Sequence, residues 1–227
     1  MDYYFITYGL TFIACIITLV AQGFVNGSYR KYSKVRNKRG IRGFEAARYV
    51  LDKNGLEDVQ ILETKGCLTD HYDPTKKVIK LSREVYHNDS IGAVAVACHE
   101  CGHAIQDKDN YIFMRIRSSL VPVVNFSSYT GYIAIVLGIL FGATNLIWLG
   151  ILAEVAILLF QLITLPVEIN ASRRALKELD YAHFLDSGEL KQGKTMLIAA
   201  ALTYVASVAN TLIQILRLIL MFGRRDE

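Results

Sequence analysis

Four long apolar segments constrain the fold of this 227-residue chain more than any other feature. They are residues 3–25, 119–141, 145–167 and 196–222, and apolar residues make up 52% of the whole chain. A helix needs about 20 mainly apolar residues to cross the hydrocarbon core of a bilayer, and each segment is long enough. The sequence therefore predicts an integral membrane protein, mainly α-helical, with about four transmembrane helices, and excludes a soluble globule.

The basic residues set the expected orientation of these helices. Seven of them closely follow the first apolar segment: Arg30, Lys31, Lys34, Arg36, Lys38, Arg39 and Arg42. Positive charge beside a membrane helix marks the cytoplasmic side. We therefore expect the two polar segments, 26–118 and 168–195, in the cytoplasm. Arg224 and Arg225, after the last apolar segment, fit this orientation least well.

The motif that carries chemistry is His99-Glu100-Cys101-Gly102-His103, in the first polar segment. On a helix, residues four apart project from one face, which is the spacing that a zinc ion needs from two imidazole ligands. Glu100 lies beside them, where a carboxylate acts as a general base toward water. Only five of the 227 residues are histidine, so chance produces such a pattern in roughly one chain in a hundred. We expect a catalytic zinc site with His99 and His103 as ligands.

The residues before the motif predict the helix that carries it. Ser90 is a typical N-cap, and the run from Ile91 to Cys98 is apolar and rich in small residues. We expect a buried helix that continues through Gln106. The alternative, a surface helix with two exposed histidines, is disfavoured because polar residues do not recur along this stretch.

A catalytic zinc takes three protein ligands, so one ligand must come from elsewhere in the chain. Asp107 continues the stripe of the two histidines, but one straight helix cannot wrap three successive turns around an ion. The remaining candidates are His71, His87, His183 and Glu168. Glu168 lies at the inner end of a predicted membrane helix, where position alone favours a carboxylate that merely ends the helix.

Three stretches of the chain resemble the YugP-like family of membrane neutral zinc metallopeptidases. They are residues 68–74, 94–106 and 165–176, and the four apolar segments match as well. The family is distantly similar to the HtpX type of membrane gluzincins, in which a Glu-x-x-Ala-Asp motif on a second helix supplies the third ligand. Glu168 and Ala171 match that motif, whereas Ser172 stands in the place of its Asp. The resemblance thus implies Glu168 as the third zinc ligand.

The resemblance also implies an activity, namely a zinc-dependent endopeptidase that hydrolyses membrane or membrane-adjacent proteins, with Glu100 as the general base. A zincin-like cytoplasmic domain with a small β-hairpin is expected, because turn residues at 70–74 precede an alternating strand at 77–81. The expected organisation is transmembrane helix 1 at 1–25, the catalytic domain at 26–118, transmembrane helices 2 and 3 at 119–167, a cytoplasmic helical segment that supplies the third ligand at 168–195, and transmembrane helix 4 with the tail at 196–227.

Further residues are candidates for supporting roles at the zinc. A metal-bound histidine donates its other N–H to a fixed acceptor, for which Asp107, Asn170 and Ser172 are available. The developing negative charge on the substrate needs a donor, for which Arg173, Tyr181 and His183 are available. The sequence does not rank the members of either group.

The expected partners are membrane lipids and a protein or peptide substrate. The basic stretch 30–42 adjoins a membrane helix, so it favours anionic lipid headgroups over nucleic acid. A bacterial inner membrane is the expected location. The alternative function is a non-proteolytic zinc-containing scaffold or chaperone-like factor, against which Glu100 argues, because a structural zinc site has no use for an unliganded carboxylate.

Polar residues also recur within the apolar segments. The third segment and its inner end carry Glu154, Gln161 and Glu168, and the fourth carries Thr203, Ser207, Asn210, Gln214 and Arg217. Polar groups in a membrane generally face a bundle interior or a water-filled cavity. One hypothesis is that the two stripes face each other and lead toward the zinc; the alternative is hydrogen bonding that only holds the helices together.

Overall fold

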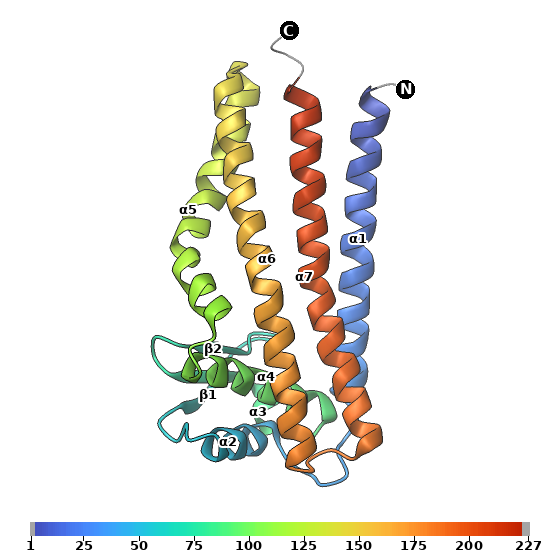
Figure 1. The fold of residues 1–227 in the computed structure, drawn as a ribbon. Helices are drawn as coiled ribbons and strands as arrows, with labels where there is room; N and C mark the ends of the chain where they lie inside the picture. The colour runs from blue at the N-terminus through green and yellow to red at the C-terminus, as the bar shows by residue number, and fades with distance from the viewer. Residues whose placement is uncertain (1–2, 224–227) are drawn as a thin grey trace. The chain divides into compact units, whose positions relative to one another are not determined.

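A computed structural model describes residues 3–223 of the chain (Figure 1), and in that range it is mainly helical with one small sheet. The helices are α1 (Tyr3–Tyr32), α2 (Gly43–Lys53), α3 (Arg83–His87), α4 (Ile91–Lys108), α5 (Ile112–Phe141), α6 (Thr144–Tyr181) and α7 (Ser187–Phe222). The strands are β1 (Gln60–Thr64), β2 (His71–Asp73) and β3 (Val78–Ser82).

Four helices, α1, α5, α6 and α7, are long and apolar enough to cross a membrane. They coincide with the four predicted apolar segments, so the expectation of a mainly helical chain with four candidate spans is confirmed. Helices α6 and α7 run for 38 and 36 residues, well beyond the apolar stretches. Each therefore carries polar side chains of the 168–195 segment on the same continuous helix as an apolar span.

The chain divides into two compact units. The first, which we call the helical unit, contains residues up to Gln22, Arg115–Leu165, and the residues from Thr203 onward. The second, which we call the mixed unit, contains Gly23–Met114 and Pro166–Leu202. The mixed unit therefore holds the whole His99–His103 motif and also Glu168.

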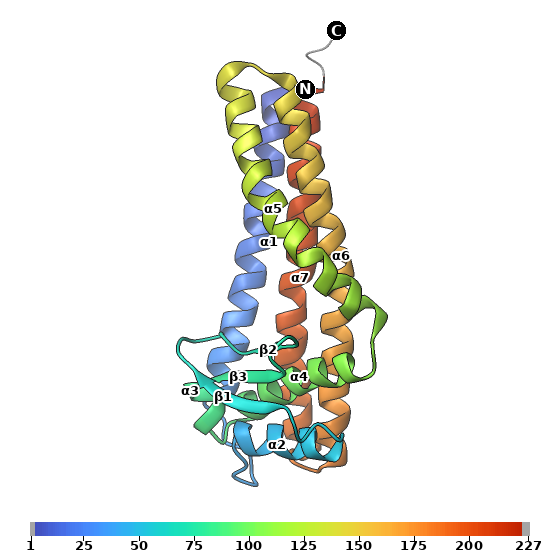
Figure 2. The same ribbon diagram turned by 90° about the vertical axis from the view of Figure 1, so that its left-hand side faces the viewer.

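The sheet of the mixed unit has the order β1-β3-β2 (Figure 2). Strand β2 pairs antiparallel with β3, with Tyr72 opposite Ile79, so the predicted hairpin is present. The turn predicted at 70–74 is misplaced, because His71–Asp73 form strand β2 and the turn follows at residues 74–77. In this turn, Asp73 accepts hydrogen bonds from the backbone N–H groups of Thr75 and Lys76. Strand β1, which was not predicted, pairs parallel with β3 on its other side. Strand β2 is consequently an edge of the sheet.

Helix α4 forms the core of the mixed unit. The Ser90 hydroxyl accepts from the backbone N–H of Ala93 at 3.1 Å and caps the helix, as predicted. Its small residues let neighbouring elements approach closely, and Val94, Ala97 and Cys98 have no exposed surface. Such burial on nearly every side confirms the prediction of a buried helix.

The polar stripe of α7 makes its contacts with α1. In the helical unit, the Asn210 amide donates to the Thr18 hydroxyl at 2.6 Å, and the Arg217 guanidinium donates to the Thr11 hydroxyl at 3.0 Å. This contradicts the hypothesis that the α7 stripe faces α6. The hydrogen bonds instead join two apolar helices, because a polar group in an apolar helix is stabilised by whichever neighbour offers a partner. Arg224 and Arg225, used above for orientation, lie outside the described residues.

Candidate metal centre

Helix α4 presents His99 and His103 on one face, as their spacing of four requires. Their ring centroids lie 4.8 Å apart in an edge-to-face arrangement. His103 is buried and His99 is partly exposed, so the pair sits at the edge of the core, where a ligand can still reach it.

Helix α6 brings the Glu168 carboxylate to the same point. Its Oε2 lies 3.3 Å from Nε2 of His99 and 3.6 Å from Nε2 of His103, and one donor atom from each of the three residues lies within 4.8 Å of the others. Zinc bonds of about 2.1 Å at tetrahedral angles separate their ligand atoms by about 3.4 Å. The two separations that involve Glu168 therefore match those around a zinc ion, and the group as a whole has the spacing of a candidate metal site.

The other ring nitrogens of the two histidines have partners as well. Nδ1 of His103 lies 3.0 Å from the Gln106 amide oxygen, and Nδ1 of His99 lies 3.1 Å from the Ser172 hydroxyl. An amide oxygen only accepts, so His103 carries its proton on Nδ1 and offers a free Nε2 lone pair beside the carboxylate. Two imidazole nitrogens and a carboxylate oxygen that converge in this way are the donor set of a zinc site, and the contacts at the Nδ1 atoms are those that metal-bound histidines make.

Gln106 is fixed by contacts across the α4–α6 interface. Its amide nitrogen donates to the Val167 carbonyl at 2.8 Å and to the Asn170 side-chain oxygen at 2.9 Å, and Arg174 donates to that same oxygen. Sequence reasoning missed Gln106. The available signal was a polar side chain three positions after His103, on the same helical face as that ligand.

Glu100 is a buried carboxylate beside the ligands. The pKa of Glu100 is raised to about 7, mainly by burial; His99 and the backbone N–H of Tyr72 lower it, and the carboxylates of Glu168 and Asp70 contribute to the rise. A carboxylate with a pKa near 7 can both accept and return a proton near neutral pH. This environment suits a general base rather than a metal ligand.

Gly102, at the centre of the motif, permits the close approach of α4 and α6. A Cβ at this position would lie 2.5 Å from the Ala171 carbonyl oxygen, closer than any side chain tolerates. Glu168 and Ser172 flank this contact on α6, one turn before Ala171 and one residue after it. The missing side chain of Gly102 thus sets the distance at which both residues meet His99.

Most other candidates from the sequence lie away from this group. His71 is exposed, with Nδ1 2.8 Å from the Thr69 carbonyl oxygen, and His87 contacts Glu63. Asp107 accepts from the Tyr72 hydroxyl at 2.8 Å. Arg173 and His183 line a separate cavity. Among the described residues, the group with metal-ligand spacing is His99, His103 and Glu168, and it includes none of these.

Comparisons with known proteins agree with this geometry. Residues 7–223 match the family described as "Putative neutral zinc metallopeptidase". The chain belongs to this family. It is also 45% identical over 219 residues to the "Putative membrane protease YugP" of Bacillus subtilis strain 168, covering 96% of this chain and 97% of that protein. No solved structure matches the chain. The chain is thus a member of a zinc metallopeptidase family. Its similarity to a membrane protease and its four apolar helices indicate that it is a membrane protein.

The first prediction concerns Gly102. Gly102→Ala forces α4 and α6 apart, so we expect zinc affinity to fall at least about tenfold and the free energy of unfolding to fall by about 1–3 kcal/mol, as for an overpacked core. Zinc titration and thermal unfolding in detergent measure both. The control is Gly193→Ala on α7, where a Cβ would meet its nearest atom at 3.5 Å. Equal zinc affinity in Gly102→Ala and Gly193→Ala contradicts the prediction.

The second prediction concerns the pH dependence of the metal-free protein. Because the folded-state pKa of Glu100 is raised from 4.5 to about 7, the folded state binds its proton more tightly, and this stabilisation is lost as pH rises from about 4.5 through 7. Glu100→Gln removes the titrating carboxylate, so the variant does not lose this stability as the pH rises. We expect the metal-free variant to exceed the wild type in stability by up to about 3 kcal/mol at pH 8.5 and to match it near pH 4.5. Thermal unfolding across pH, with exposed Glu57→Gln as control, measures this; parallel pH profiles for Glu100→Gln and the wild type contradict it.

Proposed function

We propose that this protein is a membrane-bound zinc endopeptidase that hydrolyses peptide bonds of membrane or membrane-adjacent proteins. The observation that carries the proposal is the buried Glu100, which belongs to no ligand group yet lies next to three convergent donor atoms on His99, His103 and Glu168. Membership of the neutral zinc metallopeptidase family and the identity to a membrane protease support it.

In the proposed reaction, His99, His103 and Glu168 hold the zinc. When bound, zinc supplies Lewis-acid chemistry: it polarises the substrate carbonyl and makes water acidic enough to attack near neutral pH. Glu100 takes the proton of the attacking water and passes it to the leaving amine, for which its raised pKa is suited. Ser172 contacts Nδ1 of His99, and Gln106 contacts Nδ1 of His103, so each imidazole ring is held in its orientation.

Strand β2 is the proposed place for the substrate backbone. It forms an edge of the sheet, and the backbone N–H of its central residue, Tyr72, hydrogen-bonds Glu100. An extended peptide that adds to an edge strand is positioned by main-chain hydrogen bonds, whatever its side chains are. The hairpin also has a structural role, which is to cover α4, and one hairpin can serve both roles.

The proposed location is a bacterial inner membrane, with the zincin-like domain of residues 26–118 and the 168–195 segment in the cytoplasm. The support is the basic stretch 30–42 directly after the first apolar span, since positive charge is retained on the cytoplasmic side. Membrane lipids and a protein substrate are the proposed partners. The scaffold alternative is not favoured, because the family and the relative both carry protease names.

The third prediction separates an enzyme from a scaffold. Glu100→Gln removes the base and leaves the three ligands intact, so we expect proteolysis of an unfolded reporter protein in detergent to fall by about 10²–10⁴-fold while zinc stays at one per chain. The measurement combines peptide release with metal analysis. Glu57→Gln is the control with the same change on an exposed residue. A Glu100→Gln protein with undiminished proteolysis overturns the proposed function, and so does a zinc-loaded wild type without proteolysis.

A further inference from the structure

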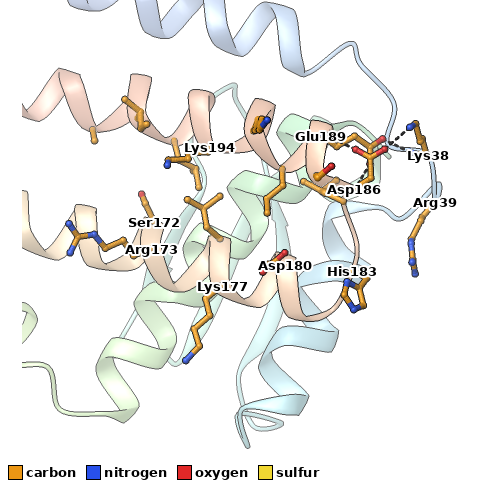
Figure 3. A pocket seen from close by; sticks show the side chains of 18 of the residues that line it. Lys38, Arg39, Ser172, Arg173, Lys177, Asp180, His183, Asp186, Glu189 and Lys194 are labelled. Carbon is orange, nitrogen blue, oxygen red and sulfur yellow. Dashed lines mark hydrogen bonds and ion pairs between the residues drawn. The ribbon is translucent and has the colours of Figure 1, made fainter.

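A cavity of about 1360 Å³ lies between α6 and α7 in the mixed unit, beside the candidate metal centre (Figure 3). Ser172 connects the two places: it lines this cavity, and its hydroxyl lies 3.1 Å from Nδ1 of His99. Figure 3 shows Ser172 on the side of α6 that faces α7, whereas the Lys177 side chain extends from α6 away from α7. The metal centre itself needs none of the charged residues that line this cavity.

The charge of the lining is predominantly positive. Of its three acidic residues, Asp186 pairs with the Lys38 ammonium at 2.5 Å, and Glu189 is buried and accepts the backbone N–H groups of Lys38 and Asp186. Glu189 has no cationic partner of its own, so its charge and that of Asp180 count against the remaining cations; with six basic and three acidic residues, the lining still carries a formal charge of +3. Five basic side chains make no ion pair with any residue that the structure describes: Arg39, Arg173, Lys177, Lys191 and Lys194. The cavity is therefore complementary to an anion.

The lining changes from basic to apolar along both helices. On α6, Ile169 lies nearer the apolar span than Arg173, and on α7, Ile198 and Ala201 lie nearer the apolar span than Lys194. Ile198 is 47% exposed, so this apolar surface is not covered by the protein. A ligand that fits has an anionic head beside the basic residues and an apolar tail that continues toward the membrane-spanning parts of α6 and α7.

We propose that this cavity binds one anionic phospholipid. Arg173, Lys191 and Lys194 hold the phosphate, and an acyl chain lies along Ile169, Ile198 and Ala201. A basic cavity between helices beside an apolar span is a typical site for an acidic lipid headgroup. An acidic peptide would pair with the basic side chains. It would leave the apolar part of the lining, next to the apolar spans of α6 and α7, without a partner. Through Ser172, the occupied site is one side chain away from a proposed zinc ligand.

The experiment uses the full chain carrying Glu100→Gln, so that its result does not depend on proteolysis. Native mass spectrometry in a neutral detergent measures binding of phosphatidylglycerol and of phosphatidylcholine with the same acyl chains. We expect one phosphatidylglycerol per chain, bound at least about tenfold tighter than phosphatidylcholine. Arg173→Gln with Lys194→Gln should weaken phosphatidylglycerol binding about 30-fold, since each cation near an anionic lipid contributes about fivefold.

The matched control is Lys65→Gln with Lys76→Gln, which removes two exposed charges of the same unit outside the cavity and should leave binding unchanged. Arg173→Lys with Lys194→Arg keeps both charges and should bind like the parent chain, which separates lost charge from lost folding. Equal binding of the two lipids overturns the proposal, and so does full binding by the Arg173→Gln, Lys194→Gln chain. Displacement of the lipid by millimolar inorganic phosphate or by an acidic peptide also overturns it, because a site for an ion or a peptide would then explain the cavity.

Discussion

The contact between the backbones of α4 and α6 is the constraint on which the rest of this structure depends. Gly102 lies so close to the Ala171 carbonyl oxygen that any side chain would collide with it. This contact sets Glu168 beside two histidines that α4 already holds on one face. Without it, α4 would offer two imidazoles, and the carboxylate that completes the group would be absent.

Hydrogen bonds across the same interface orient the ligands. Gln106 accepts from His103 while its own amide donates to Val167 and Asn170 on α6. A side chain bonded on every side cannot rotate, so the imidazole that it contacts keeps one protonation state and one direction. Glu100 is held differently, by burial and by one backbone N–H, which leaves its carboxylate free to exchange a proton. The neighbouring cavity is lined by Ser172, whose hydroxyl contacts Nδ1 of the other imidazole, His99.

The elements that could be predicted from the sequence are those specified by residues close together in the chain. The four apolar segments, the Ser90 cap, the buried helix α4 and the β2–β3 hairpin follow from length, composition and turn residues, and the structure contains all of them, with the turn of the hairpin at 74–77 instead of 70–74. Glu168 was one of several ligand candidates and became the favoured one only through a family motif, because nothing local distinguishes it from a carboxylate that ends a helix. The structure brings it to the two histidines, and its role as a ligand remains a proposal.

The features that sequence reasoning missed depend on partners distant in the chain. Strand β1 exists because β3 offers it a free edge, and Gln106 matters because Asn170 lies opposite it. The stripe that includes Asn210 faces α1 rather than α6, which periodicity along one helix cannot decide. The proposed zinc centre itself is tested most directly by X-ray absorption at the zinc edge of the purified, zinc-loaded protein. The account predicts two imidazole nitrogens and a carboxylate oxygen in the wild type, with loss of that oxygen and weaker zinc binding in Glu168→Ala. An unchanged spectrum and affinity in Glu168→Ala would contradict it.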